Sequence, residues 1–362
     1  MTRSLLIGAF VLALLGAGAY LLTQDDRSNI DASVAVAEAM GGDTTGYRRA
    51  TTVREFTFPR DHGPHPGYKT EWWYYTGNLN AADGRHFGYE LTIFRIAMTP
   101  PDSAADEPAR TDTSDWATDH FYMAHFAVSD VENEIMYDFQ RFSRGAAGLA
   151  GAQADPFRVW LEDWQASGPA GDTFPMRLRA ASDGIGVDLS LTPKKPHVLQ
   201  GDRGFSQKGP GEGNASYYYS FTRLGAEGTV AINGDTSAVE GLSWMDREWS
   251  TSALGENQVG WDWFALQLSD GRDIMYYQIR QPDGTPSPYT EGVIVAEDGS
   301  ARRIDRGDAQ LEVLDTWTND RGATYPAGWR LQIPSAQIDL TITPYFDDQE
   351  LDATVRYWEG AV

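Results

Sequence analysis

Short segments in which apolar and polar residues alternate, separated by turn residues, run through the chain from Thr51 to its end. In the clearest pair, TEWWYYTGNL (70–79) and FGYELTIFRIAM (87–98) flank a turn that contains Asp83-Gly84. Alternation with a period of two and an Asp-Gly turn predict a β-hairpin. Similar segments follow at the spacing of sandwich or barrel strands, without a βαβ rhythm. We therefore predict an all-β fold, built as antiparallel β-barrel or sandwich domains.

Two polar stretches interrupt this pattern. Residues 99–119 (TPPDSAADEPARTDTSDWATD) are rich in Pro, Asp and Ser, and a loop of that length is typically mobile or functional. Residues 199–216 (LQGDRGFSQKGPGEGNAS) are rich in Gly and lie near mid-chain. We place the domain boundary in the second stretch, which gives an N-terminal domain of residues 51–210 and a C-terminal domain of residues 211–362. Residues 23–50 are polar and small, as in a flexible spacer.

The first 22 residues have the pattern of an export signal. Arg3 precedes an uncharged apolar run of 18 residues, 5–22. The small residues 17–19 could be a cleavage site, but about 18 apolar residues also reach the lower limit for crossing a bilayer. Residues 1–22 are thus either a cleaved signal peptide or an N-terminal anchor in the inner membrane. In both cases we expect the rest of the protein in the periplasm or outside the cell.

Composition excludes several functions. The net charge of −23 and the pI near 4.5 disfavour nucleic acid as a partner, since an acidic surface repels phosphates. The absence of cysteine excludes disulfides, thiolate metal sites and a cysteine nucleophile. No metalloprotease, nucleophile-elbow, P-loop or dinucleotide-binding motif is present, and we expect neither a metal nor a cofactor.

Acidic residues next to tryptophan are the candidates for chemistry. In the strand pattern of EWWYY, Glu71 shares one face with Trp73 and Tyr75, and Trp72 and Tyr74 share the other.

The same arrangement recurs in LSWMDREWS. There Asp246 and Glu248 share a face with Trp244, and Arg247 shares the opposite face with Trp249. In GWDWFAL, Asp262 stands next to Trp263.

An aromatic environment removes water from a carboxylate and raises its pKa, so that it can act as a general acid near neutral pH. Indole rings could stabilise a developing cation. Such a site suits the protonation of a carbon–carbon double bond followed by attack of water. It equally suits binding of a hydrophobic ligand without chemistry. A third interpretation is a barrel core in which each acid pairs with an arginine from another strand.

Several of these stretches resemble the AttH-like, carotenoid 1,2-hydratase (CrtC-type) family, whose members are often labelled predicted secreted hydrolases. The resemblance rests on HPGYKTEWWYYTGNL, GYELTIFR, MAHFAVSD, KGPGEGNASYYYSFTRL, GLSWMDREWS and GWDWFALQLSDGRDIMYYQIR, and extends from about residue 51 to the end. It implies two tandem lipocalin-like domains and a pocket for an apolar ligand.

The resemblance also implies site residues. The hydratases carry a His in a DHNW-like stretch, and Arg247 stands at that place in the DREW of this chain. Arginine does not shuttle protons near neutral pH, so this position argues against carotenoid hydration. Tyr276 and Tyr277 are candidates for a tyrosine that the hydratases carry downstream. Lys208 and Tyr218 are candidates by resemblance alone.

The end of the chain is the other departure from the family pattern. The sequence stops at YWEGAV, where relatives usually continue with one or two strands. A truncated C-terminal domain is one interpretation, and a missing strand would leave a barrel edge open.

We thus predict an exported lipocalin-like protein that binds a hydrophobic small molecule or lipid-like substrate, and that either hydrates or hydrolyses it with a buried carboxylic acid or carries it unchanged. The predicted catalytic residues are Glu71, Asp246 and Glu248, with Arg247 orienting a carboxylate. The predicted ligand-binding residues are Trp72, Trp73, Tyr74, His65, His125, Lys208, Tyr218, Trp244, Trp249, Asp262, Trp263 and Tyr276. For His65 and His125, the alternative is a polar residue whose hydrogen bonds are satisfied within the fold.

Overall fold

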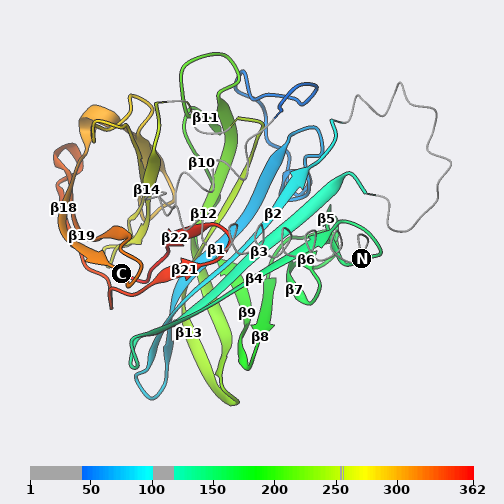
Figure 1. The fold of residues 1–362 in the computed structure, drawn as a ribbon, viewed down its shortest axis with the longest axis vertical. Coiled ribbons are helices and arrows are strands. Elements are labelled where there is room, and N and C mark those ends of the chain that lie inside the picture. Colours follow the sequence, from blue (N-terminus) through cyan, green and yellow to red (C-terminus); the bar gives the residue numbers. More distant parts are fainter. Residues whose placement is uncertain (1–42, 101–117, 253–254, 256) are drawn as a thin grey trace, which may run out of the picture. The chain divides into compact units, whose positions relative to one another are not determined.

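The computed structural model describes residues 43–100, 118–252, 255 and 257–362. These residues form 22 β-strands and three short 3-10 turns, which are η1 (Arg60–His62), η3 (Arg306–Asp308) and η4 (Pro334–Ala336). The prediction of an all-β fold is confirmed (Figure 1).

Thirteen strands form one antiparallel sheet (Figure 1). In the order of pairing they are β4 (Ile135–Arg144), β3 (His120–Asp130), β2 (His86–Ala97), β1 (Thr70–Ala81), β13 (Asp235–Ser250), β12 (Ala215–Ile232), β9 (Ile185–Pro193), β8 (Met176–Ser182), β7 (Trp164–Ser167), β6 (Phe157–Leu161) and β5 (Ala150–Ala154), while β10 (Val198–Leu199) and β11 (Phe205–Gln207) pair with β12.

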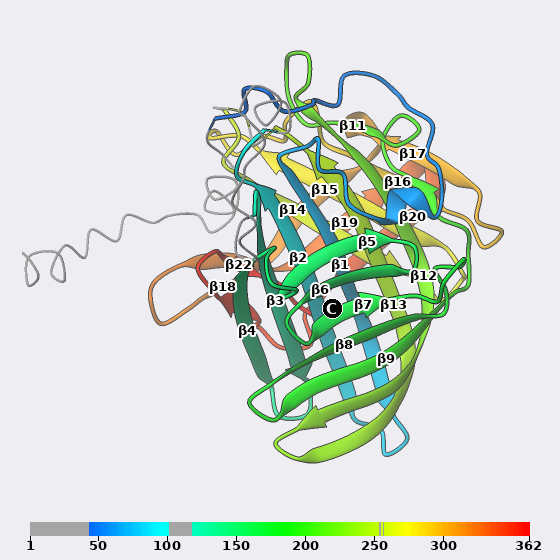
Figure 2. The ribbon, with the colours of Figure 1, turned by 90° about the vertical axis from the view of Figure 1, so that its right-hand side faces the viewer.

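This sheet curls into a nearly closed barrel. Figure 2 shows β5–β9 crossing over β1, β2 and β13, and one apolar core collects side chains from both layers. The largest of them include Trp73, Tyr75, Trp164 and Phe126, all with no exposed surface. Large aromatic side chains therefore fill the interior of this barrel.

The predicted hairpins are present, and their turns explain why. Gly84 has φ +93°, a conformation that glycine adopts without strain, in the turn between β1 and β2. Asn233 and Gly234 both have positive φ in the turn between β12 and β13, as a type I′ turn requires.

The remaining strands lie in smaller sheets. A four-stranded sheet consists of β14 (Gly260–Gln267), β15 (Asp273–Arg280), β16 (Glu291–Val295) and β17 (Ala301–Asp305), and a three-stranded sheet of β18 (Gln310–Thr318), β19 (Thr324–Ile333) and β20 (Ile338–Ile342). A shared apolar core joins these two sheets, and β21 (Glu350–Asp352) pairs with β22 (Arg356–Trp358). The large sheet and these smaller sheets therefore have separate apolar cores.

Along the chain, the last strand of the large sheet, β13, ends at Ser250, and the next strand, β14, belongs to the four-stranded sheet. Strands β12 and β13 pair with β9 and β1, so the large sheet continues across residues 210 and 211, where the sequence analysis placed the domain boundary. The Gly-rich stretch 199–216 is a connection within the large sheet.

The parts of the sequence prediction that concern the leader lie outside the described residues. Within the described residues no helix is both long and apolar enough to cross a membrane. The end of the predicted spacer is tied to the barrel, since the Tyr47 hydroxyl donates to the Ala97 carbonyl at 2.9 Å and Ala50 is fully buried.

Candidate functional site

The pairing of β1 with β13 sorts the predicted site residues onto two faces of the large sheet. Trp73 and Trp249 point into the core of the first barrel, whereas Trp244 and Tyr218 belong to a second core with residues of β15 and β16. The period-two assignment of faces in EWWYY and LSWMDREWS is correct. The structure nevertheless separates residues that the sequence analysis combined in one pocket.

Glu71 is the centre of a buried ion-pair cluster on the inner face. Its carboxylate contacts the guanidinium groups of Arg95, directly opposite on β2, and Arg247 on β13. The backbone N–H of His65 donates to both carboxylate oxygens at 3.0 Å.

The two arginines also bind the chain that precedes β1. Arg95 donates to the carbonyls of His65 and Tyr68, at 3.1 and 2.8 Å, and Arg247 donates to the carbonyl of Gly63 at 2.7 Å. The cluster therefore fixes residues 63–68 on the end of the barrel.

This cluster corrects the predicted role of Glu71. Burial alone would raise the pKa of Glu71, but the charges of Arg95 and Arg247 outweigh it and hold the pKa well below its usual range. Glu71 is therefore a carboxylate near neutral pH and not a general acid. The carboxylate that Arg247 orients is that of Glu71, and the guanidinium of Arg247 also lies over the Trp73 ring, 3.8 Å from its centroid.

Asp246 has the environment that the sequence analysis expected of an acid. It is buried on the outer face, where it accepts hydrogen bonds from the Tyr218 hydroxyl at 2.6 Å, from the Trp244 indole at 2.7 Å and from Ser220. Burial raises the pKa of Asp246 to about 7, against the lowering effect of these hydrogen bonds. Its neighbour Glu248 is also buried.

Other predicted residues surround Asp246. Lys208 lies 3.5 Å from Glu248 and over the Tyr277 ring, and the Trp263 indole donates to the Tyr218 hydroxyl at 3.2 Å. Tyr74 contacts the Trp263 ring edge-on at 5.2 Å. These aromatic and charged side chains pack the outer face of the large sheet against β14 and β15.

The remaining predicted residues have structural partners. Trp72 is half-buried beside Phe94, and Asp262 forms an ion pair with Arg280 at 3.6 Å. His125 bonds to Tyr357 and Gln140, each at 2.8 Å, and burial lowers its pKa to about 4. The Tyr276 side chain lies in the core of the smaller sheets. The alternative given for His125, a satisfied polar residue, agrees with these contacts.

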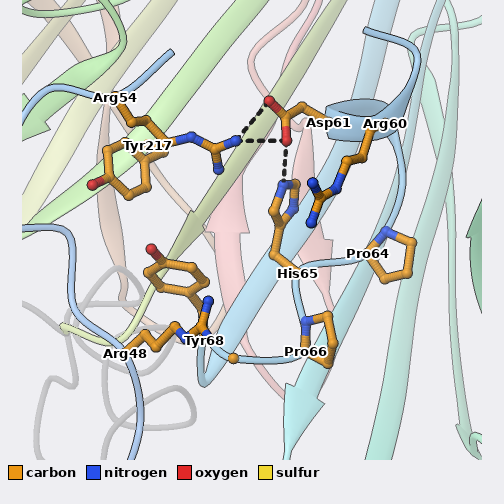
Figure 3. A pocket seen from close by; sticks show the side chains of 10 residues that line it. Arg48, Arg54, Arg60, Asp61, Pro64, His65, Pro66, Tyr68 and Tyr217 are labelled. Atoms are coloured by element: carbon orange, nitrogen blue, oxygen red, sulfur yellow. Dashed lines mark hydrogen bonds and ion pairs between the residues drawn. The ribbon is translucent and has the colours of Figure 1, made fainter. Parts of the chain in front are cut away.

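A pocket of about 550 Å³ opens where β1 and β12 begin and β13 ends. We call it the rim pocket, and Figure 3 shows its wall, which consists of Arg48, Arg54, Arg60, Asp61, Pro64, His65, Pro66, Gly67, Tyr68 and Tyr217. Of the residues predicted from the sequence, only His65 lines it. The stretch RDHGPHPGYK, dense in Pro, Gly and His just before a strand, is the signal in the sequence that could have indicated it.

His65 and Asp61 form a hydrogen-bonded pair in the wall of the rim pocket. Nε2 of His65 lies 3.1 Å from Oδ1 of Asp61, and one guanidinium nitrogen of Arg54 donates to both carboxylate oxygens of Asp61 at 2.9 and 2.8 Å. The ring of His65 stacks on Trp249 at 3.7 Å with an interplanar angle of 6°. The imidazole is thus fixed in orientation, with 11% of its side chain exposed.

No metal-binding cluster occurs in the described part of the chain. Among residues 43–100, 118–252, 255 and 257–362, no three His, Cys, Asp or Glu side chains are grouped so that they could hold a metal ion.

Comparison with known proteins identifies the family. The family model described as AttH-like matches residues 49–362. The chain belongs to the AttH-like family. This result confirms the resemblance predicted from the EWWY and SWMDREW stretches.

Two solved structures illustrate the AttH-like fold of this chain. A crystal structure of a protein from Nitrosomonas europaea assigned to AttH is 32% identical, covers 86% of this chain and 93% of its own, and has a TM-score of 0.75. Kievitone hydratase from Nectria haematococca is 16% identical, covers 87% of this chain and 89% of its own, and has a TM-score of 0.62. The second likeness concerns the fold alone. No curated protein sequence matches the chain significantly.

The raised pKa of Asp246 predicts a pH dependence of stability. Because the folded protein holds this proton to about pH 7 and an unfolded aspartate releases it near 3.8, the contribution of Asp246 is complete below about pH 4 and is lost as the pH rises through 7. Asp246→Asn should therefore flatten the fall in unfolding free energy between pH 5 and 7.5, by up to about 1.4 kcal/mol per pH unit.

Urea denaturation at several pH values measures this slope, with Asp235→Asn, an exposed change on the same strand, as the control. The unfolding free energy of Asp246→Asn should still fall somewhat with pH, because burial also raises the pKa of Glu359 to about 7. An identical slope in Asp246→Asn and wild type would show that Asp246 is ionised throughout.

Proposed function

We propose that the protein binds a small hydrophobic or lipid-like molecule in the rim pocket. The observation that carries this proposal is the pocket itself, whose volume of about 550 Å³ falls within the range of small-molecule sites. The barrel interior is filled by its own aromatic side chains, so the ligand binds at the end of the barrel and not in its centre.

The apolar part of the wall supports this assignment. Tyr68 and Tyr217 meet edge to face at 5.9 Å, and Pro64 and Pro66 contribute further apolar surface. Aromatic rings and proline offer a rigid apolar surface at little cost in conformational entropy. Tyr68 is half-buried, so part of its ring is free to contact a ligand.

The cellular setting belongs to the same proposal. The apolar run at residues 5–22 supports export, so that the protein would carry or process its ligand in the cell envelope. Cell fractionation of the host tests this, since recovery of the protein in the cytoplasm alone would contradict it.

A second candidate function is acid–base chemistry on the bound molecule, of the hydratase type. The observation that favours it is the His65–Asp61 pair in the pocket wall. Imidazole can donate and accept a proton near neutral pH, and a carboxylate partner orients it. Both ring nitrogens of His65 have partners in the fold, Nε2 at Asp61 and Nδ1 at Arg247 and Glu71. In a hydration, Nε2 would have to turn from Asp61 to donate its proton to one carbon of a double bond, and water would add to the other carbon and lose a proton to the solvent or back to the imidazole.

Binding can be tested with N-phenyl-1-naphthylamine, a neutral apolar dye that fluoresces when it leaves water. We expect binding to the wild-type protein, and Tyr68→Ala should weaken it about tenfold because a buried aromatic contact is worth about 1–2 kcal/mol. Tyr345→Ala is the matched control, since Tyr345 is 47% exposed and lies outside the pocket. Absence of dye binding, or equal affinities in both variants and wild type, would contradict the proposal.

The variant His65→Asn distinguishes a hydratase from a non-catalytic carrier. The backbone N–H of residue 65, which holds Glu71, is kept in this variant. If the protein is a hydratase, ligand co-purified from the host and incubated in H₂¹⁸O should gain labelled water with wild type, whereas His65→Asn should still bind the dye but lose turnover. A carrier would return the ligand unlabelled with both proteins. His86→Asn, a histidine outside the pocket, is the control.

A further inference from the structure

Basic residues are concentrated in the segment that builds the rim pocket. Residues 47–69 contain five Arg or Lys and two Asp or Glu, a net charge of +3 in a chain of net charge −23. Three of the five, Arg48, Arg54 and Arg60, line the rim pocket, and Figure 3 shows them reaching it from different sides.

The charges in the pocket wall do not cancel. Among the described residues of the wall, Asp61 is the single carboxylate, and Arg54 binds both of its oxygens. Arg48 and Arg60 are exposed, and their guanidinium groups make no hydrogen bond or ion pair with the residues that the structure describes. The wall therefore presents two guanidinium groups without a counter-charge from described residues.

We propose that the ligand of the rim pocket is an anionic amphiphile. Its carboxylate, sulfonate or phosphate group would bind Arg48 and Arg60, and its apolar part would lie against Tyr68 and Tyr217. Guanidinium groups present paired donors that match the oxygens of such anions, and the hydrogen bonds they form are charge-assisted. This inference rests on the proposed binding function and adds the chemical class of the ligand.

The position of the two arginines makes a solubility role a poor explanation for them. The rest of the chain is strongly acidic, and a net charge of this size favours solubility and repels anions at long range. At physiological ionic strength charges more than about 8 Å away are largely screened, so the local arginines decide what binds in the pocket.

The test uses two dyes that differ only in charge. 1-Anilinonaphthalene-8-sulfonate is N-phenyl-1-naphthylamine with one sulfonate group. In 0.15 M salt, the double variant Arg48→Gln/Arg60→Gln should bind the sulfonate dye at least about tenfold more weakly than wild type, because it loses two charge-assisted contacts. Its affinity for the neutral dye should change less than twofold, which also reports that the pocket is folded.

Arg49→Gln/Arg203→Gln is the matched control. Both residues are exposed and lie outside the pocket wall, and the double change removes the same total charge. It should leave both affinities unchanged. An equal loss in the control and in the pocket variant would show that net charge, and not Arg48 and Arg60, attracts the dye.

Competition separates the possible sources of the anion. Dodecanoate and dodecyl phosphate should displace the sulfonate dye more strongly than dodecanol, and inorganic phosphate should displace it poorly because it lacks the apolar part. Displacement by inorganic phosphate as strong as by dodecyl phosphate would replace the amphiphile with a free anion and overturn the proposal. Binding of the sulfonate dye that does not depend on Arg48 and Arg60, with dodecanol displacing it as strongly as dodecanoate, would overturn the anionic ligand and leave the proposed function intact. Failure of both dyes to bind would refute the proposed function itself.

Discussion

The buried carboxylate of Glu71, held between Arg95 and Arg247, is the interaction on which the arrangement of the first barrel's open end depends. Burying three charged side chains is costly unless each is paired and hydrogen-bonded. Here the carboxylate pairs with both arginines, three of their other hydrogen bonds go to backbone carbonyls of residues 63–68, and Arg247 also donates to the carbonyls of Trp72 and Glu248. The cluster thus joins strands β1, β2 and β13 to the segment that forms the rim pocket.

The position of His65 follows from this cluster. Its backbone N–H binds Glu71, and its ring lies between Trp249 and the Asp61 carboxylate. According to the resemblance described in the sequence analysis, the carotenoid hydratases have a histidine at the position of Arg247. In this chain the arginine there serves the buried cluster, and the histidine that faces a pocket comes from the segment before the first strand. The proposed acid–base chemistry at the rim pocket therefore uses His65 and not the DREW stretch.

The sequence was sufficient to predict strands, hairpins, the all-β fold and the inner and outer faces of EWWYY and LSWMDREWS. These features depend on a period of two and on turn residues, which are local. It was not sufficient to predict which side chains meet across strands. Glu71 pairs with Arg95, 24 residues away, and Arg247, 176 residues away, and alternation does not reveal such contacts. The acid role expected of Glu71 was therefore wrong, while Asp246, which has no basic partner among its hydrogen bonds, has the raised pKa that the pattern suggested.

The sequence pattern does not predict the rim pocket either, because its wall also depends on contacts between distant parts of the chain. Its arginines lie before β1, in loops and in the turn η1, which show no strand periodicity, and Arg48 falls within residues 23–50, for which the sequence pattern predicts a spacer. Hydrogen bonds and ring contacts that tie these segments to the barrel bring them together with Tyr217, about 150 residues later in the chain.

The stability of Glu71→Gln against urea is the most direct test of the buried ion-pair cluster. The substitution leaves two buried arginines without their shared counter-charge, and we predict a loss of about 3–5 kcal/mol in unfolding free energy, with no such loss for the exposed control Glu312→Gln. Unchanged stability of Glu71→Gln would contradict a structural carboxylate and restore Glu71 as a candidate acid.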